Sequence, residues 1–199
     1  MTRKARVELL AVTAAAVIAA SVAAVVLFAG STGAVPPTPV SNNGTPVDLS
    51  GISAQDKRAL DSTGVDGNPR LLRALHGRAF YRFSGKAGED CYATGSSAQA
   101  PVQLGTIACP KGFPTEQPIL DQSFFKFYPS GVVKPLALQG FAADRVARVA
   151  LVDAGGTVYS TPVVNNVYFL ANLPDVAVTR LVAFDASDTQ IFSHDLGRN

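Results

Sequence analysis

Hydrophobic and polar residues divide the chain into three regions. Residues 9–30 form an apolar run without a charged side chain, and residues 31–50 are rich in Pro, Thr, Ser, Asn and Gly. From residue 51 onward, short apolar stretches alternate with turn-like groups of Gly, Asn, Asp and Ser. This alternation is typical of a β-rich domain with many connections. We therefore predict an apolar helix over 9–30, a partly extended spacer over 31–50 and a β-rich domain over 51–199.

The apolar run is long enough to cross a lipid bilayer as a helix. Its 22 residues would span about 33 Å, and the hydrocarbon core of a bilayer is about 30 Å thick. Arg3, Lys4 and Arg6 precede the run, and positive flanks remain on the cytoplasmic side. We expect residues 1–8 to be a cytoplasmic tail and residues 9–30 to be a single-pass signal-anchor, with the C-terminal domain outside the cell membrane.

A cleaved signal peptide is the alternative interpretation of the same run. The hydrophobic region of a signal peptide usually has about 7–15 residues, which is shorter than this run. The segment Thr32-Gly33-Ala34 nevertheless has the small residues that a cleavage site requires. Cleavage near Ala34 would give a secreted protein, so both interpretations predict export.

Two short helices are expected at the start of the domain. Ser53 with Asp56 resembles a capping box and predicts a helix toward residue 60. The pair Asn68-Pro69 is a typical helix start and predicts a second helix that ends before Gly77. His76 would lie in the last turn of this second helix, where a cation interacts favourably with the helix dipole.

The remaining segments predict an antiparallel β-sandwich-like domain. Their β-branched and aromatic residues indicate strands over 78–83, 89–92, 102–108, 119–128, 132–140, 146–152, 157–164, 167–170, 178–184 and 190–194. An open barrel is the alternative arrangement of these strands.

The C-terminal third of the chain contains an internal repeat. Residues 148–157 match residues 180–189, and each copy contains a strand, a turn that begins with Asp and a returning strand. We expect Asp153 and Asp185 to accept hydrogen bonds from the backbone of their own turns. Two copies are too few for a solenoid, so the repeat predicts two equivalent β-hairpins.

Cys91 and Cys109 are the only cysteines of the chain. In an exported protein, such a pair predicts a disulfide, which in the chain-entropy model contributes about 3 kcal/mol. The spacing does not match the Cys-x-x-Cys of redox pairs, and a metal site would need more ligands nearby. The sequence therefore predicts one structural disulfide.

Charge argues against a nucleic-acid partner. The formal net charge of the chain is +2, and the residues from 31 onward contain 14 basic and 14 acidic side chains. A neutral domain has no long-range field that would attract phosphate backbones.

Motifs of catalysis and cofactor binding are missing from the sequence. It contains no Gly-x-Ser-x-Gly, no phosphate-binding Gly-Lys-Ser/Thr loop and no His-Glu-x-x-His. His76 and His194 are the only histidines, and residues 61–68 lack the ligand pattern of a calcium loop. We expect no catalytic residue, cofactor or metal. Sandwich domains often bind through loops, and the candidate contact loops are Ala154-Gly155-Gly156 and Asn165-Asn166.

Several short motifs resemble one group of proteins. The motifs are Gly-Arg-Ala-Phe-Tyr (77–81), Cys91-Tyr92, Cys109-Pro110, Gly140-Phe-Ala-Ala-Asp144 and Pro162-Val-Val-Asn-Asn-Val-Tyr168. Their arrangement is similar to that in membrane-anchored extracytoplasmic proteins of high-GC Gram-positive bacteria, a group without an established activity. The resemblance covers roughly residues 70–192 and implies a bacterial envelope location.

Three functions are compatible with these features. The first is a membrane-anchored binding or structural module of the cell envelope, whose partner is an envelope protein or a wall component. The second is an exported hydrolase without a recognisable motif, and the third is an accessory or sensor subunit of a membrane complex. The missing catalytic motifs favour the first function over the second.

Overall fold

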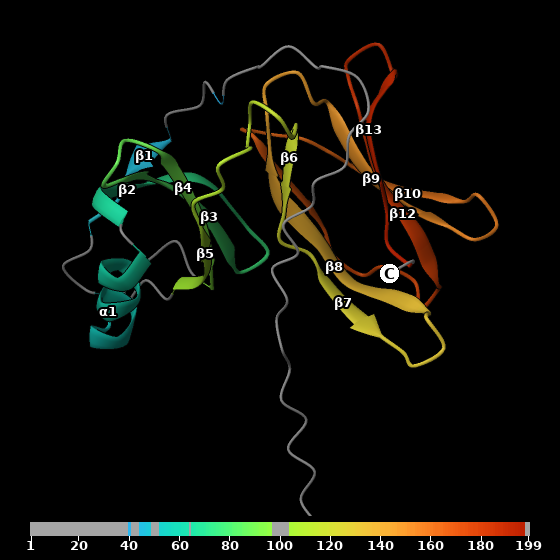
Figure 1. Ribbon diagram of the computed structural model, residues 1–199, viewed down its shortest axis with the longest axis horizontal. Coiled ribbons are helices and arrows are strands. Elements are labelled where there is room, and N and C mark those ends of the chain that lie inside the picture. The colour runs from blue at the N-terminus through green and yellow to red at the C-terminus, as the bar shows by residue number, and fades with distance from the viewer. Residues whose placement is uncertain (1–39, 41–43, 49–51, 64, 97–103, 198–199) are drawn as a thin grey trace, which may run out of the picture.

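The fold consists of two antiparallel β-sheets and one helix in the part of the chain that the structure describes. The computed structural model describes residues 40, 44–48, 52–63, 65–96 and 104–197. The predicted signal-anchor over 9–30 lies outside these residues. Within them, no helix is long and apolar enough to cross a membrane. Figure 1 shows the N-terminal sheet and helix on the left and the C-terminal sheet on the right.

The N-terminal sheet has five strands in the order β1-β2-β3-β4-β5. The elements are β1 (Thr45–Pro46), α1 (Ala54–Thr63), β2 (Val65–Leu75), β3 (Arg78–Gly85), β4 (Asp90–Gly95) and β5 (Leu104–Ala108). The first predicted helix is confirmed as α1. The backbone N–H of Asp56 donates to the Ser53 hydroxyl at 3.0 Å, as expected for a capping residue.

The second predicted helix is wrong, because its residues belong to β2. This strand pairs with β3, and Leu71 lies opposite Tyr81. Leu72 is buried in the cluster that contains Phe80, so packing against the aromatic strand outweighs the local helix-start signal. Pro69 is tolerated there because β2 is irregular, with register shifts on both sides of Arg70 and Leu71.

His76 consequently lies in a tight hairpin turn instead of a helix end. Both residues of the β2–β3 turn have positive φ, 48° at His76 and 73° at Gly77. Two-residue hairpins with this conformation match the right-handed twist of the strands that they join. The glycine that was expected to end a helix therefore serves a β-turn.

The folded part also begins earlier than the composition of residues 31–50 predicts. Val40 is buried with a relative exposure of 5%, and β1 pairs with β2. The Val47 N–H donates to the Pro69 carbonyl at 3.0 Å. Thr45 and Pro46 of the predicted spacer are therefore part of the N-terminal sheet.

The C-terminal sheet has eight antiparallel strands and a sandwich-like arrangement. The strands are β6 (Ile119–Asp121), β7 (Phe124–Phe127), β8 (Val133–Ala142), β9 (Arg148–Asp153), β10 (Val158–Pro162), β11 (Val167–Leu170), β12 (Val178–Phe184) and β13 (Gln190–Asp195). The order is β10-β9-β12-β8-β11, with β13 beside β12 and with β6 and β7 beside β8. The single strand expected over 119–128 is interrupted at Gln122 and Ser123.

The internal repeat is confirmed as two hairpins that share a central strand pair. The hairpins β9–β10 and β12–β13 meet through β9 and β12, where Leu151 lies opposite Leu181. Because β9 and β12 are antiparallel, the two hairpins point in opposite directions. Their turns therefore lie at opposite ends of the sheet.

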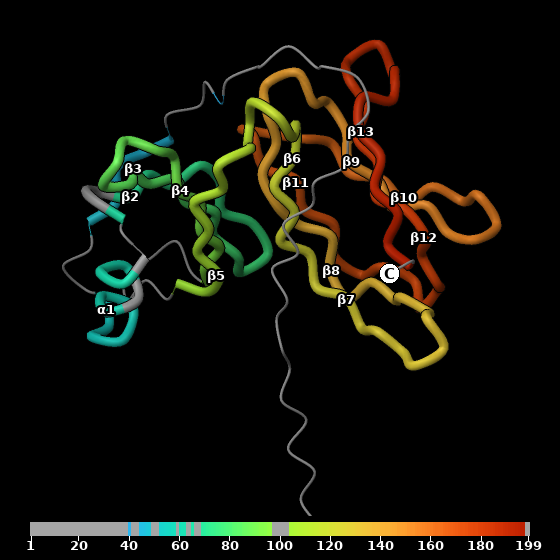
Figure 2. Tube along the Cα trace, viewed as in Figure 1, coloured from blue at the N-terminus to red at the C-terminus, as the bar shows by residue number. Residues whose placement is uncertain are grey.

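The two sheets meet at an aromatic interface. The rings of Phe80 and Phe141 lie 5.7 Å apart in an edge-to-face contact, and the rings of Tyr92 and Phe141 lie 4.9 Å apart. Phe80 also contacts Phe169 of β11 at 6.2 Å. These side chains form a buried cluster with residues from both sheets, so the sheets are packed together rather than joined only by the connection traced in Figure 2.

Candidate functional site

The predicted disulfide between Cys91 and Cys109 is present. It joins β4 to the segment after the edge strand β5. The carboxylate of Glu89 lies near both sulfur atoms, and the three groups are within 4.8 Å of one another. The sulfurs are bonded to each other and are not thiolates, so this group is a cross-link and not a metal site.

The two predicted contact loops do not come together. In the β9–β10 hairpin, Val158 pairs with Val152 at one end and Pro162 pairs with Arg148 at the other. The exposed turn 154–156 is therefore at the end opposite to residues 165 and 166. A single ligand of small size cannot contact both loops.

Asn166 has a structural role within its loop. Its side chain is 8% exposed, and Nδ2 donates to the Ala142 carbonyl at 3.0 Å and to Asp144 Oδ1 at 2.8 Å. Asn165 is exposed, and both asparagines have positive φ. Of this pair, Asn165 is the exposed residue.

The Asp turns of the repeat are closed by their own hydrogen bonds. Asp153 Oδ1 accepts from the N–H groups of Gly155 and Thr157, both at 2.8 Å. Asp185 Oδ1 accepts from the N–H groups of Ser187 and Thr189, both at 2.9 Å. Both predictions are confirmed. These hydrogen bonds explain the two Asp residues as parts of their turns, and no ligand is needed to explain them.

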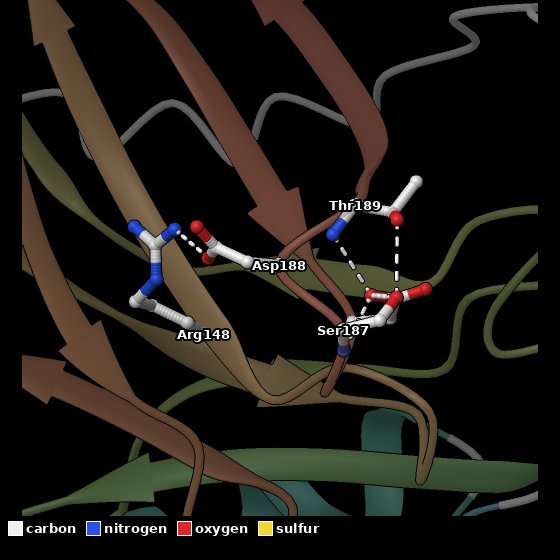
Figure 3. Close-up of polar contacts among 5 residues, drawn as sticks. Arg148, Ser187, Asp188 and Thr189 are labelled. Carbon is white, nitrogen blue, oxygen red and sulfur yellow. Dashed lines mark hydrogen bonds and ion pairs between the residues drawn. The ribbon is translucent and has the colours of Figure 1, made fainter.

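Figure 3 shows the second turn, where Arg148 of β9 forms an ion pair with Asp188. The guanidinium of Arg148 also lies 3.8 Å from the centre of the Phe184 ring. The hydroxyls of Ser187 and Thr189 are 3.0 Å apart. Arg148 neutralises Asp188 here, and the second carboxylate of the turn, Asp185, accepts the hydrogen bonds of its own backbone.

The two histidines lie on different sheets. His76 is in the β2–β3 turn, where its ring stacks on Phe169 at 5.8 Å. His194 is on β13 and pairs with Leu181, and burial lowers its pKa. They therefore do not act as a pair.

A buried polar cluster lies at the interruption between β6 and β7. Asp121 Oδ1 accepts from the Ser123 hydroxyl at 2.5 Å, from the Ser123 N–H at 3.2 Å and from the Tyr168 hydroxyl at 2.9 Å. Burial raises the pKa of Asp121 to about 6, although these hydrogen bonds act in the opposite direction. A Cβ atom at Gly140 would overlap the Tyr168 hydroxyl and the Leu120 carbonyl.

The glutamines next to this cluster are also buried. Gln139 is fully buried, and its Nε2 donates to the Gln122 carbonyl at 3.1 Å. The Gln139 Oε1 atom and both polar side-chain atoms of Gln122 are buried without a partner. The Leu120 carbonyl and the Tyr168 side chain fill the space beside Gly140. We assign the cluster to the structure of the β6–β8 region.

A shallow cleft of about 340 Å³ lies where the N-terminal sheet approaches β7. Its walls come from the start of β3, the end of β4, the edge strand β5 and the start of β7. The lining residues are Arg78, Thr94, Gly95, Ser96, Leu104, Gly105, Thr106 and Phe124. Small-molecule sites usually have volumes of about 300–1,000 Å³ and often lie between two structural units.

Arg78 is the single charged side chain in the lining of this cleft. Its guanidinium lies 5.4 Å from the centre of the Phe124 ring. Among the described residues it forms no ion pair. The cleft is therefore positively charged, polar on the β4–β5 side and aromatic on the β7 side.

Sequence reasoning missed every residue of this cleft. They come from four separate segments, and none of the segments has a recognisable binding motif. Comparison of the chain with protein-family models, with curated proteins and with solved structures found no match in any of the three. The geometry is thus the basis on which a function is argued.

Proposed function

We propose that this chain is an exported, membrane-tethered module that binds a component of the cell envelope through the cleft. The observation that carries the binding role is the cleft itself, with an unpaired arginine, an aromatic wall and polar groups from β4 and β5. Few convergent polar groups in a mostly preformed depression are typical of small-ligand sites. The module needs no catalytic residue for this role.

The location rests on two features of the chain. The apolar run over 9–30 with its basic flank favours an anchor with the C-terminal domain outside. The disulfide between Cys91 and Cys109 supports the same side, because disulfides persist in oxidising compartments. The resemblance to envelope proteins of high-GC Gram-positive bacteria agrees with both features.

Protease added to intact cells tests the location. A full-length chain with a C-terminal epitope should lose the epitope, while a cytoplasmic marker protein remains intact. Protection of the epitope until the cells are lysed would contradict the export proposal. Retention of the mature domain with the membrane pellet would distinguish an anchor from cleavage near Ala34.

Co-sedimentation with insoluble cell-wall material tests the binding role. The full-length protein in detergent micelles should sediment with purified wall material, and Arg78→Gln should remain in the supernatant. Arg180→Gln is the matched control, because Arg180 is exposed on β12 and is not part of the cleft. Equal sedimentation of both variants and the parent protein would refute binding through the cleft.

A further inference from the structure

We infer that the cleft binds a sugar that carries a carboxylate, such as a uronic acid residue of an envelope glycan. This inference rests on the proposed function and adds the chemical class of the ligand. Four observations support it: the charge of Arg78, its lack of an ion pair among the described residues, the polar groups of the β4–β5 edge and the size of the cleft.

The charge of the cleft selects an anion. Arg78 is the only charged residue among the eight that line it, so no carboxylate of the protein competes for the guanidinium there. A guanidinium presents parallel N–H groups that match the two oxygens of a carboxylate. The Phe124 ring on one side of the guanidinium supports its position without using the N–H donors.

Three other partly buried cations of the fold are paired with carboxylates. Arg82, four residues further along β3, donates from Nε and from a terminal nitrogen to Asp90, at 2.9 and 2.7 Å. Lys134 pairs with Asp175 at 2.9 Å, and Arg148 pairs with Asp188. Arg78 differs from these three because it has no carboxylate partner among the described residues. Arg73 and Arg145 are also partly buried without an ion pair, but neither lines the cleft.

The opposite wall supplies groups that suit the hydroxyls of a sugar. Thr94 and Thr106 face the cleft from β4 and β5, and the pairing of these strands shifts register between Ala93 and Gly95. A Cβ atom at Gly105 would come within 3.2 Å of the Thr94 carbonyl, so the backbones approach closely here. Irregular pairing of this kind is frequent beside binding sites because it re-aims the local polar groups.

The size and the apolar part of the cleft fit one ring rather than a long chain. The volume of about 340 Å³ lies at the lower end of the range for ligand sites. Leu104 and Phe124 provide apolar surface against which the C–H face of a sugar ring can pack. The carboxylate of a free peptide would have the same charge as that of an acidic sugar. A peptide has no row of hydroxyl groups, so it would not use the polar groups of β4 and β5 in the same way.

Titration calorimetry of the full-length protein in detergent micelles tests the inference with three probes. Glucuronate should bind, whereas glucose, which lacks the carboxylate, should bind at least about ten-fold more weakly, since hydrogen bonds to charged groups are the strong ones. Glucose 6-phosphate tests whether the cleft prefers a phosphate to a carboxylate. Tighter binding of the phosphate than of glucuronate, or equal binding of glucose and glucuronate, would overturn the carboxylate assignment.

Two variants locate the binding in the cleft. Arg78→Gln should weaken glucuronate binding at least about ten-fold, and Arg180→Gln should leave it unchanged. If Arg78→Gln does not retain the β-sheet circular dichroism signal, Thr106→Val gives a second reading, with an expected loss of several-fold. Glucuronate binding that neither variant weakens would refute the site.

The two experiments separate the ligand class from the general role. Sedimentation with wall material that depends on Arg78, together with no binding of glucuronate, would reject the acidic sugar and keep the envelope-binding role. Glucuronate binding that depends on Arg78, without sedimentation, would reject the wall as the partner and keep the chemical class.

Discussion

Removal of the buried charge at Asp121 should stabilise the protein at neutral pH. Asp121 is only partly buried as a residue, but its carboxyl group is enclosed, and its pKa rises from 3.8 to about 6. All three hydrogen bonds to the side chain reach Oδ1. An asparagine at this position therefore keeps the same acceptor and removes the charge, and it replaces Oδ2 by an amide NH2 group.

The magnitude follows from the pKa difference between the folded and unfolded states. The folded state binds the proton more tightly, so this group favours folding below about pH 4 and loses that effect as the pH rises through 6. A rise of about two pH units corresponds to about 3 kcal/mol. Above pH 7, Asp121→Asn should therefore exceed the parent protein in stability by up to about 3 kcal/mol.

Urea unfolding followed by circular dichroism at several pH values measures this effect. The difference in unfolding free energy between Asp121→Asn and the parent protein should be small at pH 4 and should grow until about pH 7. Tyr168→Phe removes a hydrogen bond that lowers the pKa of Asp121, so the pKa of Asp121 should be higher in this variant. A difference between Asp121→Asn and the parent that is the same at all pH values would refute the reasoning.

Three further changes test the packing and the turns by the same unfolding assay. Replacing Cys91 and Cys109 together by Ala should cost about 3 kcal/mol, and a reducing agent should then have no additional effect on the variant. Phe80→Ala should cost about 3–5 kcal/mol because the ring is fully buried between the sheets, whereas Phe127→Ala, which is 59% exposed in the parent, should cost much less; equal losses would contradict the interface. Asp185→Ala should destabilise the protein at pH 7 and have less effect at pH 3, because the hydrogen bond from Ser187 lowers the pKa of Asp185 and its contribution is lost as the pH falls; an effect that does not depend on pH would exclude a role for the charge.

Local patterns predicted most of the C-terminal sheet. Strands β11 and β12 begin and end at the residues that the sequence indicates, and the Asp-opened turns of the repeat form the expected hydrogen bonds. These features depend on neighbouring residues, namely strand alternation and a side chain that bonds its own turn. The disulfide was predicted from the number of cysteines and from the expected export of the chain, and both come from the sequence alone.

The failures come from contacts between distant segments. Asn68-Pro69 has a helix-start pattern, but the choice of a strand depends on the pairing of β2 with β3 and on burial against Phe80. Gln122 and Ser123 separate β6 from β7, and both of these strands pair with β8. The periodicity of the sequence does not reveal such a break. The cleft joins β3, β4, β5 and β7, so no single segment contains its signal.

The strand β3 shows why the two arginines of its sequence differ in role. Alternate side chains of a strand share a face, so Arg78, Phe80 and Arg82 face the second sheet, while Ala79 and Tyr81 face the core beneath α1. Phe80 fixes this face against Phe141 and Phe169. On one side of Phe80 along the strand, Arg82 forms an ion pair with Asp90. On the other side, Arg78 contacts the ring of Phe124. Packing of the central ring thus determines where Arg78 lies, and the proposed binding site depends on the contact between the sheets.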